Sequence, residues 1–523
     1  MADPDILGSG DDEVPPVRLE GLTAEQLRML AYASAIGREF DFRLLVAAMG
    51  ADEESLAEQI ERLVHRGILR ERVGGDRFGF VEEDTRARVY KSLTASRLRV
   101  LHRKIAEAME RLFPNPPPEI IPELGRHYFL GKEPKKSYEY NLRAAELARA
   151  DDNPEVASHH LERARIDVKA LPGNHGRDEA RLAEQLGDLY YSMGDVASAD
   201  RLYTEALAHA GRADPRLKAR LVLARAEVAR ENLQNESALQ NAREARELFR
   251  AEGDQLGMAQ SHRILGRVAF NRGAYRESLD ECLVALELLR GVDDPRTLGR
   301  LSIDIGNAFA VLGPEVQEEA VEWYQRAIDR LTQAGDWGEL SRAYHNLGVA
   351  VGESRPSDGL EYLQRAREFG EKAHEPRHAV WPLVTGVEMR LNLGQVEDAQ
   401  RDNEQAGRIL ERLDDQLGVQ QVIRNRGLIC EKRGQWEDAE KAYHSAIEMA
   451  ERYELAPEVA EGHFLLARLK FKTRDLATAR EEFGLATHLE LPKLKPSLLV
   501  SLVELGRQLS KASSESQDSS ASA

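Results

Sequence analysis

Apolar and small positions recur along most of this chain with the spacing of paired amphipathic helices. The stretch HRILGRVAFNRGAYRESLDECLVALEL at residues 262–288 is typical, and related stretches follow at similar intervals. The small residue that follows each turn returns at intervals of 39, 40, 42, 39, 40, 40 and 40 residues, at Ala199, Ala238, Ser278, Ala320, Gly359, Ala399, Ala439 and Ala479. This regularity predicts about eight helical hairpins over residues 181–491.

Glycines occupy interior positions of these helices, although such a glycine costs about 1 kcal/mol relative to alanine. Gly266 lies twelve residues before its turn residue, Ser278, and Gly187 and Gly427 have the same spacing. We expect Gly266 to lie where a neighbouring helix leaves no room for a Cβ atom. We expect Gly273 to end the first helix of its hairpin.

The order Leu-Gly, turn glycine, Ala, Tyr or Phe, and Ala resembles the tetratricopeptide repeat family. GDWGELSRAYHNLGVAV and GDQLGMAQSHRILGRVAF resemble its extended subtype with Leu-Gly-Asn signatures. The family period is about 34 residues, so a spacing near 40 implies longer helices or longer loops. The resemblance implies an all-α fold, a right-handed superhelix of paired helices.

Residues 18–113 do not follow this period. TAEQLRMLAYASAIG, DFRLLVAAMG and DEESLAEQIERLVHRGI predict three helices, with Thr23 as N-cap, Gly50 closing the second and Asp52 starting the third. ILRERVGGDRFGFV then predicts a hairpin of two short strands. Three helices followed by such a hairpin predict a winged helix-turn-helix domain.

We expect residues 114–180 to form a helical junction into the repeats. The sequence from about Leu27 to Ala170 resembles the winged-helix segment and repeat junction of STAND-type signalling ATPases. The stretches that carry the resemblance are AIGREFDFRLLVAAMGADEESLAEQIERLVHRGIL, FGFVEEDTRARVYKSLTASRLRVLHRKIAEAME and ELGRHYFLGKEPKKSYEYNLRAAELA. Those ATPases carry an upstream phosphate-binding loop, and this sequence contains neither GxxxxGKS nor GxxxxGKT. The nearest match, FLGKEP, places Glu133 after Lys132 where the motif needs Ser or Thr. The sequence therefore does not predict ATP hydrolysis.

Composition narrows the function classes further. The net charge of -18 disfavours a protein that coats nucleic acid with its whole surface. Two cysteines, Cys282 and Cys430, exclude a disulfide framework, and both fall on positions expected in the core. We find no HExxH, GxSxG or other catalytic pattern, so we expect no enzyme activity, cofactor or metal. The acidic start and the lack of a long apolar run favour a cytoplasmic protein.

The predicted third helix is poorly suited to be a DNA-recognition helix. Residues 52–66 carry five acidic residues against Arg62 and Arg66. Basic residues cluster after the hairpin instead, at Arg86, Arg88, Lys91, Arg97, Arg99, Arg103 and Lys104. They form either a solvated helix face or a patch for a partner or nucleic acid.

The resemblance to tetratricopeptide repeats implies that the first helices of successive hairpins line a concave groove for a peptide or helix. The residues at groove-facing positions, together with Asn346 next to them, are Arg263, Arg267, Arg300, Asn307, Arg342, His345 and Arg424. The arginines predict a basic groove for an acidic partner, unless they are ordinary residues of an Arg-rich surface. Asn307 and Asn346 are candidates to hold the partner's backbone, because a carboxamide both donates and accepts.

We expect a capping helix over residues 492–510, and disorder in the Ser-rich tail, 511–523, and in residues 1–17. The sequence predicts a non-enzymatic protein-interaction scaffold with a regulatory or signalling role. Two alternatives stay open: a transcription regulator that binds DNA through the winged helix, and the sensor half of a STAND-type ATPase that acts with a separate NTPase chain. The sequence leaves the oligomeric state open.

Overall fold

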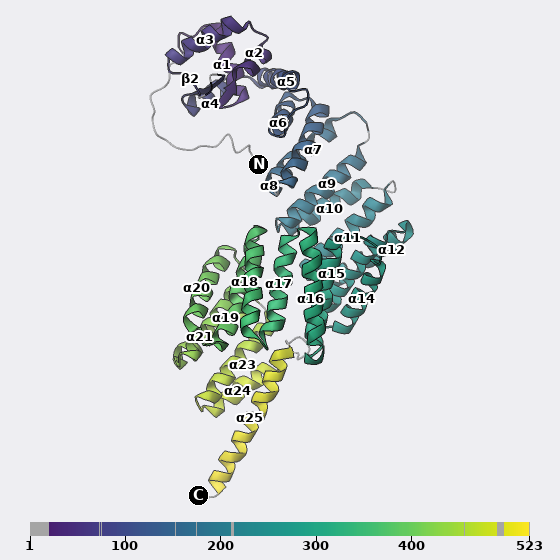
Figure 1. The fold of residues 1–523 in the computed structure, drawn as a ribbon, viewed down its shortest axis with the longest axis vertical. Coiled ribbons are helices and arrows are strands. Elements are labelled where there is room, and N and C mark those ends of the chain that lie inside the picture. Colours follow the sequence, from purple (N-terminus) through teal and green to yellow (C-terminus); the bar gives the residue numbers. More distant parts are fainter. Residues whose placement is uncertain are drawn as a thin grey trace. The chain divides into compact units, whose positions relative to one another are not determined.

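The computed structural model describes residues 20–521 except 73, 75, 152, 174, 211–213, 454 and 489–495. The segment 1–17, expected to be disordered, lies outside the described residues. The chain divides into two units, residues 1–221 and 222–523, and the boundary falls within one helix, α11. Helices dominate both units (Figure 1), which confirms the predicted helical class.

The first unit begins with helices and three short strands and continues with helices alone. Its elements are α1 (Ala24–Ile36), β1 (Glu39–Asp41), α2 (Phe42–Met49), α3 (Glu53–His65), β2 (Leu69–Glu71), β3 (Arg77–Phe80), α4 (Glu83–Lys91), α5 (Ala95–Leu112), α6 (Ile121–Gly131), α7 (Pro134–Ala150), α8 (Pro154–Ala170), α9 (Gly176–Ser192), α10 (Val196–Ala210) and the start of α11 (Pro215–Glu231).

The second unit consists of the rest of α11 and further helices. These are α12 (Asn235–Glu252), α13 (Gln255–Asn271), α14 (Tyr275–Leu288), α15 (Pro295–Leu312), the 3-10 helix η2 (Pro314–Val316), α16 (Gln317–Ala334), α17 (Trp337–Gly352), α18 (Pro356–Lys372), α19 (Pro376–Asn392), α20 (Val396–Arg412), α21 (Gln416–Lys432), α22 (Trp436–Arg452), α23 (Ala456–Lys472), α24 (Leu476–His488) and α25 (Pro496–Ala521).

The first three helices begin where the sequence predicted, and α2 ends at the predicted glycine. The Thr23 hydroxyl accepts a hydrogen bond from the Gln26 amide, and the Gln26 side chain accepts one from the Thr23 amide, so α1 starts with a capping box. Asp41 caps α2, and Gly50 ends it in the left-handed conformation with φ of +58°. Asp52 precedes α3.

The predicted hairpin is present as β2 and β3, which pair antiparallel from Leu69 opposite Phe80 to Glu71 opposite Phe78. A third strand was not predicted: β1 pairs with β3, which gives the sheet order β1-β3-β2. Three residues are too few to show a period of two in sequence, so the pairing of β1 depends on its tertiary position. Phe40 of β1 is buried.

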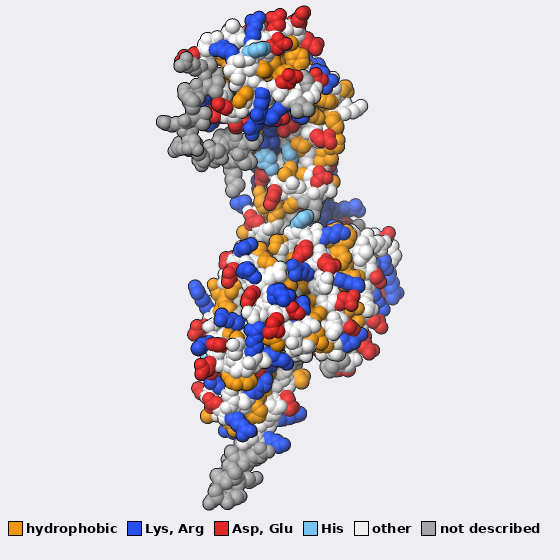
Figure 2. All heavy atoms as spheres, turned by 60° about the vertical axis from the view of Figure 1, so that its left-hand side comes forward, with side chains coloured by type: hydrophobic (Ala, Val, Ile, Leu, Met, Phe, Trp, Pro, Cys, Tyr) orange, Lys and Arg blue, Asp and Glu red, His pale blue; other side chains and the backbone are white. Residues whose placement is uncertain are grey.

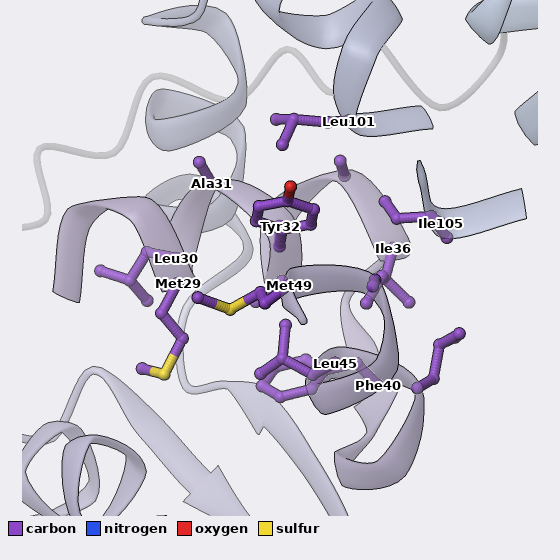
Figure 3. Close-up of a cluster of buried hydrophobic side chains, with 14 of the residues drawn as sticks. Met29, Leu30, Ala31, Tyr32, Ile36, Phe40, Leu45, Met49, Leu101 and Ile105 are labelled. Atoms are coloured by element: carbon purple, nitrogen blue, oxygen red, sulfur yellow. The ribbon is translucent and has the colours of Figure 1, made fainter. Parts of the chain in front are cut away.

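One apolar core joins these elements. Figure 3 shows Tyr32 of α1, Phe40 of β1 and Leu45 of α2 in the same cluster as Leu101 and Ile105 of α5. All five side chains are nearly fully buried. Helix α5 therefore belongs to the same folding core as α1 and α2.

A chain of buried hydrogen bonds ties α4, α5 and α6 together. Arg126 Nη2 lies 3.1 Å from His127 Nε2, His127 Nδ1 lies 2.8 Å from His102 Nδ1, and His102 Nε2 lies 2.9 Å from the Tyr90 hydroxyl. Because a guanidinium can only donate, His127 accepts at Nε2 and donates from Nδ1. His102 then accepts at Nδ1 and donates to Tyr90, so both imidazoles are neutral in this arrangement.

Acid should therefore destabilise the first unit. Burial, with Arg126 adding to it, lowers the pKa of His102 to about 3 and holds the pKa of His127 well below its ordinary value of 6.5. The unfolded chain binds these protons below pH 6.5 while the folded chain does not, so stability falls from pH 6.5 towards 3 by up to about 1.4 kcal/mol per pH unit for each histidine.

Urea titrations between pH 7 and 4, read by pulsed hydrogen exchange of peptides from α5 and α6 at a fixed labelling pH, measure this effect. His102→Asn should reduce the pH dependence, because asparagine gains no proton. His65→Asn, at an exposed site, should leave it unchanged. Equal pH dependence in the His102 variant and the wild type would contradict the explanation.

The helices of the second unit form antiparallel hairpins in chain order, and the hairpins α15–α16 and α17–α18 lie side by side (Figure 1). A Cβ atom on Gly266 would lie 2.8 Å from Cys282 Sγ and 3.1 Å from the Ser278 carbonyl oxygen, so the predicted close approach of the two helices is confirmed. Gly273 follows α13 with φ of +78°, as expected for a helix end.

A second set of glycines lies between successive hairpins, and we had not predicted a role for them. A Cβ atom on Gly257 would lie 2.2 Å from Phe249 Cδ1, and one on Gly418 would lie 2.5 Å from Leu410 Cδ2. In both cases the large side chain comes from the preceding hairpin. Glycine thus lets the helices approach within a hairpin and between neighbouring hairpins.

The two cysteines and the C-terminal helix differ in part from the expectations. Cys282 is buried as expected, whereas Cys430 is only half-buried. Residues 511–521 continue helix α25, although their composition predicted disorder; residues 492–495 and 522–523 lie outside the described part. Leu502 and Leu505 of α25 are buried with residues of α23 and α24. No helix among the described residues is long and apolar enough to cross a membrane.

Candidate functional site

The predicted groove residues lie on the first helices of four hairpins of the second unit. Neighbouring first helices contact one another from α13 through α15, α17 and α19 to α21. The residues are Arg263 and Arg267 on α13, Arg300 and Asn307 on α15, Arg342, His345 and Asn346 on α17, and Arg424 on α21.

Arg263 and Arg267 lie between two carboxylates from the neighbouring helices. Arg267 Nη1 lies 2.7 Å from Glu227 Oε1, and Arg263 Nη1 lies 3.1 Å from Asp304 Oδ2. Burial raises the pKa of the Glu227 carboxyl, but Arg267, Arg263 and Arg230 outweigh this effect and hold that pKa below its ordinary value. These groups form an ion network that joins α11, α13 and α15.

Arg300 of α15 and Arg342 of α17 pair with carboxylates at the start of α17. Arg300 Nη2 lies 3.1 Å from Asp336 Oδ2, and Arg300 Nε lies 3.2 Å from Glu339 Oε1. Arg342 Nη2 lies 2.8 Å from Glu339 Oε2. Glu339 therefore shares its two carboxylate oxygens between α15 and its own helix, α17.

Arg424 is buried between carboxylates of α19 and α23. Its Nη2 lies 2.6 Å from Glu388 Oε1, and its Nη1 pairs with Glu461. The adjacent Asn425 donates from Nδ2 to the Val384 carbonyl oxygen at 2.9 Å. Arg424 and Asn425 thus connect consecutive first helices and are covered by them.

These pairings do not favour the basic groove that the arginines predicted. Each of the predicted arginines has at least one carboxylate partner, so none of them stands alone as a positive charge. On the face drawn in Figure 2, Lys and Arg side chains are interspersed with Asp and Glu over much of the surface. The arginines and their partners neutralise each other and fix the spacing of the helices.

His345 does not provide positive charge either. Burial, with His378 adding to it, lowers the pKa of His345 to about 4, so the side chain is neutral at pH 7. Its Nε2 lies 3.5 Å from the Thr385 hydroxyl of α19. The residue connects α17 and α19 and presents no charge to a ligand.

The two asparagines do come together. Asn346 donates from Nδ2 to Asn307 Oδ1 at 2.8 Å, and the Tyr324 hydroxyl donates to the same oxygen at 2.9 Å. Asn307 Oδ1 is thereby occupied, which leaves the Asn307 Nδ2 group as a donor and the Asn346 Oδ1 atom as an acceptor. No described residue bonds to either of these two atoms.

A small cavity of about 200 Å³ opens beside this pair. Phe270, Ala310 and Val349 are among its apolar lining, and Val349 is 38% exposed. Glu353 stands at its exposed edge. The site combines one free donor, one free acceptor and a shallow apolar surface.

The sequence did not reveal the acidic partners of the arginines. Arg263 and Asp304 are 41 positions apart, and Arg424 and Glu461 are 37 apart. These separations are close to the repeat period, so charges of opposite sign about one period apart were the available signal. The cavity had no such signal, because Phe270 and Val349 look like ordinary apolar positions of their repeats.

Comparison with family models identifies tetratricopeptide repeats at residues 182–217 and 426–487. A search of the curated proteins found no match. Among solved structures, the chain is similar to a STAND signal transduction ATPase with a tetratricopeptide repeat sensor from Pyrococcus horikoshii, at 15% identity and a TM-score of 0.48. The match covers 83% of this chain and 64% of that protein, so this chain spans less than two thirds of its length.

Two further solved structures are similar to this chain. One is a Rap protein complexed with competence and sporulation factor, at 13% identity and a TM-score of 0.45, with 66% of this chain and 99% of that chain covered. The other is aspartyl phosphate phosphatase F from Bacillus subtilis, at 15% identity and a TM-score of 0.43, with 74% and 94% covered. By the two matches to family models, this chain contains tetratricopeptide repeats.

Proposed function

We propose that this protein is a non-enzymatic scaffold that binds an extended segment of another protein at the Asn307–Asn346 pair. The observation that carries the proposal is the pair of unused polar groups, the Asn307 Nδ2 donor and the Asn346 Oδ1 acceptor. A peptide group offers one C=O and one N–H, so a partner's main chain can satisfy both. The tetratricopeptide repeats also support a role in protein interaction.

The cavity adds a requirement on the partner's side chain. With about 200 Å³ and a lining that includes Phe270, Ala310 and Val349, it accommodates a small or medium apolar side chain next to the bound peptide group. The paired arginines give no preference for an acidic segment at this surface. They act as positioning residues that keep α13, α15 and α17 at a fixed spacing.

A peptide library displayed against the full chain tests this function. For peptides selected by the wild type, Asn307→Ala and Asn346→Ala should each weaken binding by about threefold to tenfold, because each removes a hydrogen bond worth about 0.5–1.5 kcal/mol. The double variant should bind at least as weakly as either single variant. Dissociation constants from fluorescence anisotropy provide the measurement.

Asn392→Ala is the matched control, because Asn392 is exposed at the end of α19 and does not line the cavity. Its affinity for the selected peptides should equal that of the wild type. If the selected peptides bind the double asparagine variant as tightly as the wild type, the binding site lies elsewhere and the proposal is wrong.

We also propose that residues 18–113 form a winged helix that serves as a second protein-contact surface in a regulatory protein of the cytoplasm. Three helices and an antiparallel hairpin in this order support the assignment. The exposed face of α3 carries Glu53, Glu58 and Glu61, which disfavours contact with DNA phosphates. Protein contact is therefore the better use of this surface.

A further inference from the structure

A run of positive charge without negative charge follows the strands of the first unit. The sequence from Thr85 to Ala106 contains seven Lys and Arg residues and no Asp or Glu, in a chain with 90 acidic and 72 basic residues. These residues form most of α4 and the first two thirds of α5. The overall charge of the chain therefore hides a local excess of the opposite sign.

The structure separates these cations into two groups. Arg86, Arg88 and Arg103 pair with carboxylates that lie outside the run. Four cations form no ion pair with any described residue, and all four are exposed: Lys91, Arg97, Arg99 and Lys104. We call these four residues the α5 patch, although Lys91 is the last residue of α4 and only the other three lie on α5.

The fold directs the α5 patch to solvent. Leu101 and Ile105 of α5 are fully buried in the core of the first unit, which fixes the rotation of the helix. Arg97 and Lys104 are seven residues apart and so share a face over two helical turns, about 10 Å. The first turn of α5 contains no acidic residue, and its helix dipole adds positive potential there.

From this geometry we infer that the α5 patch is a docking surface for an acidic segment of a partner protein. Charge complementarity argues for an anionic partner, because these four exposed cations form no ion pair within the described part of the chain. A nucleic acid would also approach the acidic face of α3 in the same small unit.

The inference does not depend on the Asn307–Asn346 site. It also places the expected acidic partner at the α5 patch and not at the groove. The arginines that the sequence placed in a groove are neutralised, whereas the cations of the α5 patch are not. An acidic segment on α5 and a main-chain segment at the asparagines are thus two separate contacts.

The test measures binding of a labelled Glu-Ala-Ala-Glu repeat peptide to the full chain by fluorescence anisotropy at low and at physiological salt. The wild type should bind this peptide, and higher salt should weaken binding. The counterpart with Gln in place of Glu should not bind. K91E/R97E/R99E/K104E should weaken binding by about tenfold or more.

A charge-matched control separates the α5 patch from net charge. R62E/R355E/R365E/R401E makes the same charge change at exposed arginines that pair with acids three or four residues away, and it should bind the peptide nearly as the wild type does. N307A/N346A should also bind as the wild type, which keeps this test apart from that of the proposed function. If reversal impairs folding by circular dichroism, K91Q/R97Q/R99Q/K104Q replaces it.

Three results would overturn the inference. The first is no binding of the acidic peptide by the wild type at low salt. The second is an equal loss of binding in the control variant, which would mean that only net charge matters. The third is tighter binding of duplex DNA than of the acidic peptide, which would assign the α5 patch to nucleic acid.

Discussion

Gly359→Ala is expected to destabilise the second unit by about 2 kcal/mol, although alanine favours a helix by about 1 kcal/mol. A Cβ atom on Gly359 of α18 would lie 2.6 Å from Gly352 Cα and 2.9 Å from the Gly348 carbonyl oxygen of α17. Both are backbone atoms, so the two helices must separate. Overpacking of this kind costs about 1–3 kcal/mol or more, which exceeds the gain in propensity.

Gly484→Ala is the matched control for this substitution. Gly484 also lies within a helix, α24, and a Cβ atom there would meet no atom within 4 Å. Alanine should therefore stabilise α24 by up to about 1 kcal/mol. Thermal unfolding of both variants measures the difference, and a Gly359 variant with a midpoint at or above that of the wild type would contradict the close contact of α17 and α18.

Glu227→Gln should cost about 3 kcal/mol of stability in the second unit. Glu227 is largely buried and lies against Arg230, Arg263 and Arg267. The neutral side chain would leave three guanidinium groups near one another, with Asp304 as the partner of two of them. Removing one member of a buried ion network costs about 3–5 kcal/mol, and the remaining carboxylate lowers this cost.

Glu247→Gln provides the comparison at the surface. Glu247 pairs with Arg246 and Arg250, but half of its side chain is exposed. The same substitution there should change stability by less than about 1 kcal/mol. Urea unfolding of both variants decides the question, and equal losses at the two sites would show that burial does not strengthen the Glu227 network.

Much of the fold was predictable because it repeats. Gly266 and Gly273 could be assigned their roles from spacing alone, since the same pattern recurs in other hairpins of the chain. The glycines between hairpins were harder to assign, because Gly257 and Gly418 face side chains of a preceding hairpin. Strand β1 was not predicted for a related reason: its pairing with β3 is a tertiary contact that three residues do not encode locally.

The candidate site was predictable only in part. Asn307 and Asn346 were named from their positions in the repeat, and the structure brings them into contact. The arginines were named on the same basis, but the structure pairs each of them with a carboxylate, which the repeat position did not indicate. The position of a residue in its repeat indicates the helix face on which its side chain lies. Whether the charge of an arginine is neutralised depends on the carboxylate that a neighbouring repeat places opposite it. Arg424 has two such partners, Glu388 and Glu461.

Photo-crosslinking of a selected peptide tests whether a partner segment binds beside Asn307 and Asn346. A photo-reactive residue in place of Glu353 stands at the exposed edge of the cavity. One in place of Val284 stands exposed on α14, a second helix of its hairpin. If the peptide binds beside the two asparagines, it should crosslink at position 353 and not at position 284. Crosslinking at position 284 without crosslinking at position 353 would contradict it.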